Sequence, residues 1–326
     1  MVDELSVFEP LSDFDREIWG EELEDFVPGR VFDTHIHLWD PRFAPHGKST
    51  VPATRFQTLD AWSRQVFPRR ELHYLLMGFP YAGMSFDGFH DFMAGEIAKS
   101  PDRLGSALVS PQMSPEELDA IIERHHFSGL KPYFSFSPKG ASSRITDFFP
   151  EALVEVADSR RMFVTLHLAK SEGIANPENL ADLAHLTKRY PNVRWILAHC
   201  ARAFNPATLE NIIRKLRDMP NIFYDLAAVC NARSIWLLFR HEALSRIFFG
   251  TDNIAAGGIH GQYIAWGKGW QFFRPGPLPH CRQEATLVCY ESLRSIRQAA
   301  DMADLSTGDI EDVFFNNADR FFRDDG

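Results

Sequence analysis

Two histidines separated by one residue, His35 and His37, are the residues of this sequence whose chemistry is easiest to interpret. They lie in residues 32–39, Phe-Asp-Thr-His-Ile-His-Leu-Trp, a segment apolar enough to form a buried strand. Side chains alternate along a strand, so both imidazoles and Asp33 point to the same side. Because imidazole nitrogen is a preferred ligand of Zn²⁺ and similar cations, the pair is a candidate metal site. The spacing alone also fits a solvated pair or a pair satisfied in the core.

Three further titratable residues stand at the ends of short, largely apolar runs. They are His167, His199 and Asp252. If these runs are parallel strands of one barrel, their carboxyl ends meet at the face where barrel active sites are built. Accidental convergence of so many polar groups on that face is improbable. The sequence therefore predicts one site that these residues form together with the histidine pair.

Eight short runs rich in Val, Ile, Leu and Phe supply strands that can position these residues. Each run is apolar on both faces, as expected for a parallel strand covered by helices. The predicted strands are residues 31–38, 73–80, 104–110, 129–134, 162–169, 193–199, 222–227 and 246–251.

Segments with helical spacing separate these runs. Residues 114–124 open with Ser114 as a cap, then Pro115 and two glutamates, all of which favour a helix N-terminus. Residues 177–190 and 206–219 repeat the device with Asn before Pro, and a further helix is predicted at about 282–300. Alternation of strands and helices with short connections predicts an α/β protein, a closed (β/α)8 TIM barrel.

Two segments lie outside this alternation. Residues 1–30 form an acidic N-terminal extension with four aromatic residues, which predicts a helix packed on a barrel domain of residues 31–326. Residues 254–282 form a long insertion after the eighth strand, rich in Gly and aromatic residues. An insertion this long is usually functional, and His260, Trp266 and Trp270 could belong to a lid over the site. Packing against the barrel wall or a second subunit is the alternative.

Composition excludes several classes of protein. The net charge is -10 and no run of Lys and Arg exceeds two residues, which argues against a nucleic-acid partner. The four cysteines contain no C-x-x-C pair and fit a reducing compartment. The first 24 residues do not resemble a signal peptide, and no apolar run has the length of a bilayer. We therefore expect a cytoplasmic protein without a membrane partner. Its oligomeric state stays open, with a homodimer as one option.

The candidate site residues and the sequence around them resemble the pattern of the amidohydrolase superfamily. The likeness is greatest to its amidohydrolase-2 branch, which includes enzymes similar to aminocarboxymuconate-semialdehyde decarboxylase and also lactonases. It covers residues 31–322, and the tail at 315–322 is similar to the Asn-Ala-x-Arg-x-Phe ending of the branch. The residues that carry the resemblance are Asp33, His35, His37, His167, His199 and Gly250-Thr251-Asp252.

The resemblance implies a role for each residue of the predicted site. One divalent metal, most commonly zinc, would be coordinated by His35, His37, His167 and Asp252. His199 would stand beside it as a general acid/base or as a group that polarises the substrate. A Lewis-acid metal lowers the pKa of its water from ~15.7 to about 7. Asp252 has a second possible role as the base that takes the proton of this water.

Other residues could bind the substrate. Lys131 ends the fourth strand, and a lysine from that strand is carboxylated and bridges two metals in other branches of the superfamily. Binding of a substrate anion and a structural ion pair are the alternatives for it. Arg202 could bind a substrate carboxylate through its planar fork, or form a salt bridge at a surface or interface. Trp39 and Tyr133 lie near strand ends, where they line the pocket or pack.

The predicted chemistry favours a metal-dependent hydrolase that acts on a small lactone, amide or related carbonyl compound. A non-oxidative decarboxylase of an aromatic or muconate-like acid would use the same metal, His199 and Asp252. A barrel that keeps its metal only as a structural element is the alternative from another class. The presence of acid/base groups beside the predicted ligands counts against it.

Overall fold

Eight parallel strands in chain order form the centre of the computed structural model, which describes residues 8–254, 256–274, 276, 280 and 284–323. Backbone hydrogen bonds from Thr34 to Phe249 and from Asp252 to His35 join the first strand to the chain around the eighth. All eight predicted strands, and with them the barrel-like α/β fold, are confirmed. The strands are β1 (Arg30–Leu38), β2 (Glu71–Gly78), β3 (Leu104–Val109), β4 (Gly129–Pro132), β5 (Phe163–Leu166), β6 (Arg194–Leu197), β7 (Ile222–Asp225) and β8 (Ile247–Phe248).

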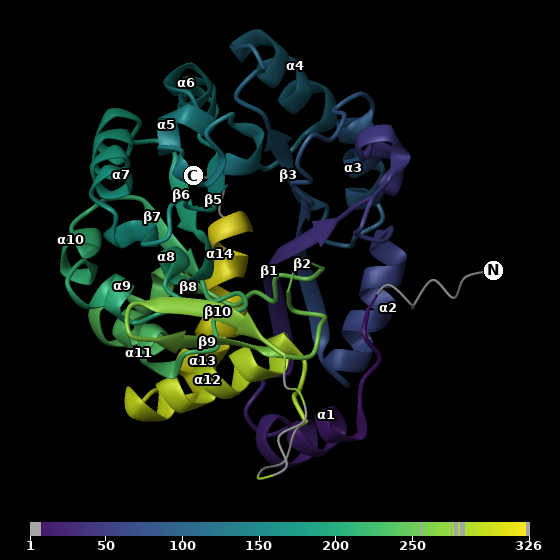
Figure 1. Ribbon diagram of the computed structural model, residues 1–326, viewed down its shortest axis with the longest axis vertical. Coiled ribbons are helices and arrows are strands. Elements are labelled where there is room, and N and C mark those ends of the chain that lie inside the picture. The colour runs from purple at the N-terminus through teal and green to yellow at the C-terminus, as the bar shows by residue number, and fades with distance from the viewer. Residues whose placement is uncertain (1–7, 255, 275, 277–279, 281–283, 324–326) are drawn as a thin grey trace.

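Helices surround the sheet (Figure 1). The main ones on the outside are α2 (Phe56–Val66), α3 (Phe89–Ile97), α4 (Pro115–His125), α5 (Ile145–Phe148), α6 (Glu151–Ser159), α7 (Pro177–Arg189), α9 (Ala207–Glu210), α10 (Ile213–Arg217), α11 (Ala232–His241) and α12 (Val288–Met302). No helix in the described part of the chain has both the length and the hydropathy needed to cross a bilayer.

The capping residues explain where two of these helices begin. The Ser114 hydroxyl accepts a hydrogen bond from the Glu117 amide at the start of α4, and Asn176 does the same for Glu178 at the start of α7. Both predicted helices are therefore confirmed. The continuous helix predicted at residues 206–219 is wrong, because α9 ends at Glu210 and α10 begins only at Ile213. Asn211 lies at the break, and asparagine competes with the helix for backbone hydrogen bonds.

The helix predicted at about residues 282–300 begins later than expected, at Val288. Residues 281–283, which include Cys281, lie outside the described residues. The other three cysteines are buried and free.

The C-terminal end of the chain closes the barrel at the ends where its strands begin. A π-helical turn (Asp312–Asn316), preceded by α13 (Thr307–Glu311), leads into α14 (Asn317–Arg323), which lies near the centre of the ring in Figure 1. The Phe321 ring lies 4.5 Å from that of Phe223 and 5.1 Å from that of Phe248. Arg194, the first residue of β6, donates to the Phe321 carbonyl. This aromatic cluster seals one end, so the opposite end remains for a site.

The described part of the N-terminal extension, residues 8–30, packs on the barrel. It contains α1 (Asp13–Ile18) and a π-helical turn (Trp19–Leu23). The Phe8 ring stacks on Trp62 with centroids 4.4 Å apart, and Trp19 contacts Tyr290 at 5.7 Å. The insertion after β8 forms an antiparallel hairpin of β9 (Gln262–Trp266) and β10 (Gly269–Phe273), which crosses the lower half of Figure 1.

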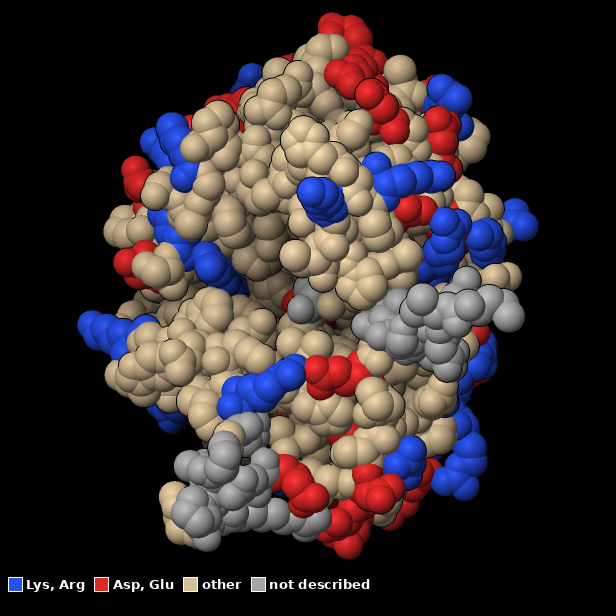
Figure 2. Space-filling model, turned by 45° about the vertical axis from the view of Figure 1, so that its right-hand side comes forward, with Lys and Arg blue, Asp and Glu red and all other residues tan. Residues whose placement is uncertain are grey.

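The face drawn in Figure 2 is hollowed near its centre. The atoms around the hollow are mostly uncharged, and Lys and Arg are interspersed with Asp and Glu farther out. Positive and negative groups thus alternate on this face, an arrangement that does not favour a polyanionic partner.

Candidate metal centre

Five polar side chains meet where the strands end. His35 and His37 come from β1, and His167, His199 and Asp252 directly follow the ends of β5, β6 and β8. They line a cavity of about 130 Å³ together with Phe79, Pro80 and Tyr133. The predicted convergence of these residues is therefore observed, at the end of the barrel where the strand carboxyl termini lie.

Each of the four imidazoles is held through its Nδ1 atom. A carbonyl or carboxylate accepts there, which fixes the ring orientation and leaves Nε2 as the nitrogen with a lone pair. The Nδ1 partners are Asp225 Oδ2 for His35 at 2.9 Å, the Gly78 carbonyl for His37 at 3.1 Å, the Leu168 carbonyl for His167 at 3.1 Å and the Ala227 carbonyl for His199 at 2.9 Å.

The electrostatics favour binding of a cation. Burial lowers the pKa of His35, His37 and His167, which keeps these rings in the neutral form that binds metals. Burial alone would raise the pKa of Asp252. The imidazoles of His37, His199 and His35 outweigh this effect and hold its pKa below the usual range. The centre thus combines neutral imidazoles with one carboxylate.

The distances among three of these residues are short enough for a shared ion. Ligand atoms of His35, His37 and Asp252 all lie within 4.8 Å of one another, and Asp252 Oδ1 is 3.4 Å from His37 Nε2 and 3.7 Å from His35 Nε2. The His167 and His199 ring centroids are 5.0 Å apart on the same cavity. A set of imidazole nitrogens and one carboxylate oxygen fits Zn²⁺ and similar divalent metals.

Comparison with protein families agrees with this geometry. A family model described as amidohydrolase (Amidohydro_2) matches residues 32–323. The chain belongs to the amidohydrolase-2 family. A search of curated proteins gives no significant match to this amidohydrolase.

Solved structures share the fold of this amidohydrolase at low sequence identity. A probable 2-pyrone-4,6-dicarboxylic acid hydrolase from Acinetobacter baumannii is 13% identical, with a TM-score of 0.59 over 90% of this chain and 98% of that one. The 5-carboxyvanillate decarboxylase from Sphingomonas paucimobilis is also 13% identical, with a TM-score of 0.54 over 91% and 99%. A dihydroxybenzoic acid decarboxylase from Polaromonas sp. JS666, solved with bound manganese and an inhibitor, is 14% identical, with a TM-score of 0.57 over 91% and 97%.

An unusual backbone turn carries His199 in this amidohydrolase. The segment Ala198–Arg202 (α8 in Figure 1) has positive φ from His199 onwards, at 57°, 53°, 59° and 63°. A left-handed conformation costs a residue other than glycine about 1–2 kcal/mol, so the surroundings must hold it. Asp225 contributes, because its Oδ1 accepts from the His199 amide at 2.8 Å. The turn places His199 at the cavity and Arg202 at its rim.

Asp225 therefore organises two members of the centre. It lies fully buried at the end of β7, with one oxygen on His35 Nδ1 and the other on the amides of His199 and Ala227. Asp225 lies as close to His35 and His199 as a shared metal ligand would. It contacts His35 on Nδ1, however, whereas Asp252 lies on the Nε2 side of the same ring, so Asp225 orients the imidazole from outside the centre.

One predicted substrate residue of the amidohydrolase lines the cavity, and a second contacts a residue that lines it. Tyr133 lines it, with its ring 4.9 Å from that of His167. Lys131 is fully buried, and its Nζ lies 3.5 Å from His35 Nε2. Burial lowers the pKa of Lys131 to about 8, although Asp225 and Asp252 act in the opposite direction. No described carboxylate forms an ion pair with this lysine, so its charge faces the centre.

Trp39 lies behind the cavity wall. It is fully buried, donates to the Ser49 hydroxyl and stacks on Tyr81 at 5.0 Å. Phe79, which sequence reasoning did not single out, lies between it and His37, with a ring 5.8 Å from the imidazole. Phe79 and Pro80 directly follow β2, and only their place beside a predicted strand end could have indicated them.

Arg202 lies at the rim between two aromatic rings. Its guanidinium carbon is 5.9 Å from the centre of Phe134 and 5.7 Å from that of Trp270. Its Nη1 donates to the carbonyls of Leu168 and Lys170, while its buried Nε has no hydrogen-bond partner among the described residues. One edge of the planar fork is therefore left without a protein acceptor.

The two tryptophans of the insertion differ in position. Trp270 packs on Phe204 at 4.5 Å, and Phe204 stacks on the His199 ring at 5.4 Å. Tyr263 contacts the same phenylalanine at 4.7 Å. Trp266, at the end of β9, is 53% exposed. The hairpin thus presents Trp270 to the site and Trp266 to solvent, and Phe204 was not predicted from the sequence.

Proposed function

We propose that this amidohydrolase-family enzyme is a metal-dependent hydrolase that acts on a small lactone, amide or related carbonyl compound in its barrel domain, residues 31–326. The observation that carries the proposal is the convergence of four imidazoles, each oriented through Nδ1, with one carboxylate of lowered pKa. The cavity of about 130 Å³ is suited to a small substrate.

In this proposal His35, His37, His167 and Asp252 hold one divalent cation, with zinc as the best match to the donor set. The ion would act as a Lewis acid and lower the pKa of bound water to about 7. Manganese is the metal of the Polaromonas neighbour, and metal analysis distinguishes the two. A second ion would require a further anionic ligand such as a carboxylated Lys131.

The acid and base groups follow from the same geometry. Asp252 remains a carboxylate because His37 and neighbouring imidazoles lower its pKa, so it can accept a proton at the cavity. His199 contacts the cavity with its Nδ1 on the Ala227 carbonyl, and its other nitrogen can donate to or polarise the substrate. Tyr133 then lies where it can contact the substrate carbonyl, while the Lys131 Nζ contacts His35 Nε2 at 3.5 Å.

A decarboxylase of an aromatic or muconate-like acid is the second candidate. The observation that favours it is Arg202, whose Nε lacks a described acceptor and whose guanidinium lies between Phe134 and Trp270. A planar acid could place its ring between these aromatic groups and a carboxylate on this arginine. Two of the structural neighbours are decarboxylases.

A substrate panel with the metal-loaded protein tests both candidates. Lactones and amides would be followed by release of acid, and aromatic acids by release of CO₂. Turnover of lactones or amides that disappears after chelation supports the hydrolase. Turnover of acids alone would replace it with the decarboxylase. Tightly bound metal without turnover in either panel would favour the non-catalytic barrel.

The hairpin provides a separate prediction. Trp270→Ala is expected to lower kcat/KM or change substrate preference about 2- to 12-fold, because aromatic contacts contribute about 0.5–1.5 kcal/mol. Its metal content should stay at the wild-type value. Trp266→Ala is the matched control, since this ring is mostly exposed. Equal kinetics in wild type and both variants would show that the hairpin serves packing or assembly instead.

A further inference from the structure

The N-terminal extension contacts both ends of residues 258–287, the part of the chain that contains the β9–β10 hairpin. At the first end, the Glu9 amide donates to the Gly258 carbonyl at 3.3 Å. At the second, the Leu287 amide donates to Asp15 Oδ1 at 2.9 Å. His260 and Leu287 also form a β-bridge with each other. The two ends of this part of the chain therefore come together against the N-terminal extension.

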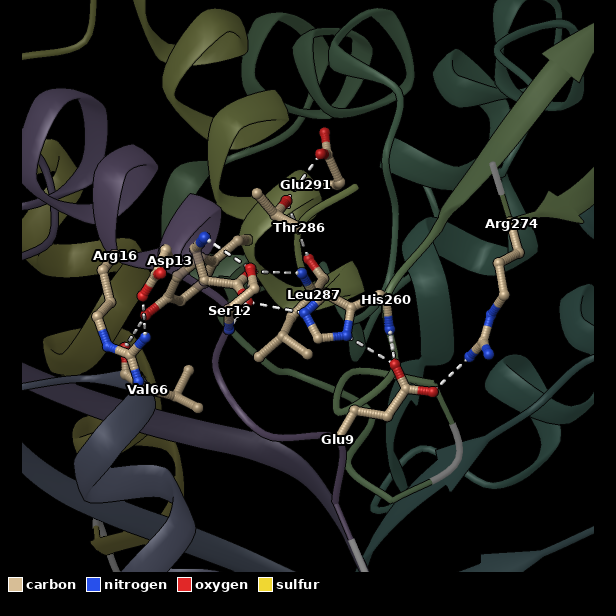
Figure 3. Close-up of polar contacts among 12 residues, drawn as sticks. Glu9, Ser12, Asp13, Arg16, Val66, His260, Arg274, Thr286, Leu287 and Glu291 are labelled. Carbon is tan, nitrogen blue, oxygen red and sulfur yellow. Dashed lines mark hydrogen bonds and ion pairs between the residues drawn. The ribbon is translucent and has the colours of Figure 1, made fainter. Parts of the chain in front are cut away.

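His260 is the centre of this contact (Figure 3). Its Nδ1 lies 2.7 Å from Glu9 Oε2 and its Nε2 lies 2.7 Å from Asp15 Oδ2. Because each ring nitrogen faces a carboxylate, the geometry suits the imidazolium, which donates from both nitrogens. The backbone amide of His260 also donates to Glu9. The other Glu9 oxygen accepts from Arg274, the residue after β10.

This network fixes the base of the hairpin. His260 precedes β9 by two residues, and Arg274 follows β10 directly, so both strands are held on the Glu9 side. Gly261, between His260 and β9, has a φ of 146°, and a side chain there would meet the Phe272 ring. At the opposite end, the Asn205 amide donates to the carbonyls of Gly267 and Gly269. The hairpin is therefore held at its base and at its turn.

The part held between these points packs next to the candidate metal centre through Phe204. Tyr263 on β9 and Trp270 on β10 both pack on Phe204, which stacks on His199. A shift at the base of the hairpin would move both rings relative to the site.

We propose that Glu9, Asp15 and His260 are positioning residues that hold the β9–β10 hairpin over the metal centre. The N-terminal extension thus becomes part of the cover of the site. For its kinetic consequence the inference rests on the proposed function, while the position of the hairpin can be measured without a substrate.

The charges predict how this contact depends on pH. Glu9 and Asp15 face the ring directly, and Arg274 faces Glu9. The hydrogen bond with Asp15 raises the pKa of His260, burial opposes this, and Glu9 adds to the rise. The contact is therefore complete below the unfolded pKa of about 6.5 and is lost as the pH rises through the higher folded value. The pKa of both carboxylates is lowered, so they stay charged until the pH falls below about 4.

Hydrogen exchange of the full-length, metal-loaded protein tests the proposal. We would compare wild type with Glu9→Gln and His260→Gln. Asp13→Asn is the matched control, since Asp13 lies in the same extension but pairs with Arg16 at the surface. Exchange in residues 262–273 should accelerate about 10- to 100-fold in the two test variants, as expected for hydrogen bonds between charged groups. Barrel strands and the control should keep wild-type exchange.

Two further measurements separate positioning from general stability. The rate of metal removal by a chelator should rise in the test variants at unchanged metal content. Protection of the wild-type hairpin should fall between pH 6 and 9, after correction for intrinsic exchange, and this fall should vanish in His260→Gln. Unchanged hairpin exchange, or equal acceleration throughout the barrel, would overturn the proposal. A loosened hairpin in a protein that binds no metal would support the positioning role and reject the proposed function alone.

Discussion

His37→Ala is expected to leave the purified protein with less than about one tenth of the wild-type metal, which should be near one ion per chain. Replacing only an outer partner of a metal ligand typically costs 10–100-fold in affinity, and the loss of a ligand should cost at least as much. The His37 Nε2 lies 3.4 Å from Asp252 Oδ1, so its removal opens one side of the donor set. The same result is expected for His35→Ala. Elemental analysis after gel filtration measures the metal.

His185→Ala is a suitable control for the histidine variants. This histidine lies on α7, its side chain is 54% exposed, and it contacts Glu151 outside the barrel mouth. Its metal content should equal that of wild type, and the melting temperatures should show that all variants fold. Stoichiometric metal in His37→Ala would remove His37 from the ligand set. Two ions per wild-type chain would instead support a carboxylated Lys131.

The strands of this barrel could be predicted because their signal is local. Each is a short apolar run, and burial between helices and the barrel interior requires apolar residues on both faces. Helix α4 could be predicted for the same reason, since Ser114, Pro115 and the following glutamates act within one turn. The positions of His167 and Asp252 then followed from strand ends, because parallel strands bring those ends together.

The turn that carries His199 could not be predicted in this way. Four consecutive residues with positive φ, none of them glycine, contradict local preference. They depend on the Asp225 carboxylate, which belongs to the next strand and accepts from the His199 amide. The break at Asn211 similarly overrode a helix predicted from its ends. Backbone strain is common at functional sites, and local sequence rules fail there first.

Contacts between segments that are distant in the chain could not be predicted from the sequence either. Trp39 was a pocket candidate because it lies near a strand end, yet Phe79, which directly follows β2, lies between it and His37. His260 and Glu9 are 251 residues apart, and nothing near either residue predicts their pairing. The predicted extension and insertion were each recognised, but their contact depends on how the barrel closes.

Asp252→Asn is expected to fold as wild type and to lose about 10²–10⁴-fold in kcat on the substrate that the panel identifies, the usual contribution of a general base. The backbone of Asp252 has a φ of 62°, a conformation that asparagine also adopts readily. Its amide still donates to the His35 carbonyl, because this bond uses the main chain. The fold around the site should therefore persist.

The side chain accounts for the expected loss. An amide cannot take up the proton that the carboxylate accepts, and it is a weaker ligand for a divalent cation. Kinetics should be measured with saturating added metal and with metal content determined in the same samples, so that weaker ligation is separated from loss of the base. Asp60→Asn is the matched control, because this carboxylate on α2 bonds to Tyr74 and Arg64 away from the cavity. Turnover within about threefold of wild type in metal-loaded Asp252→Asn, well short of the usual loss, would leave Asp252 as a ligand and assign proton transfer to His199, the imidazole at the cavity that lies outside the proposed ligand set.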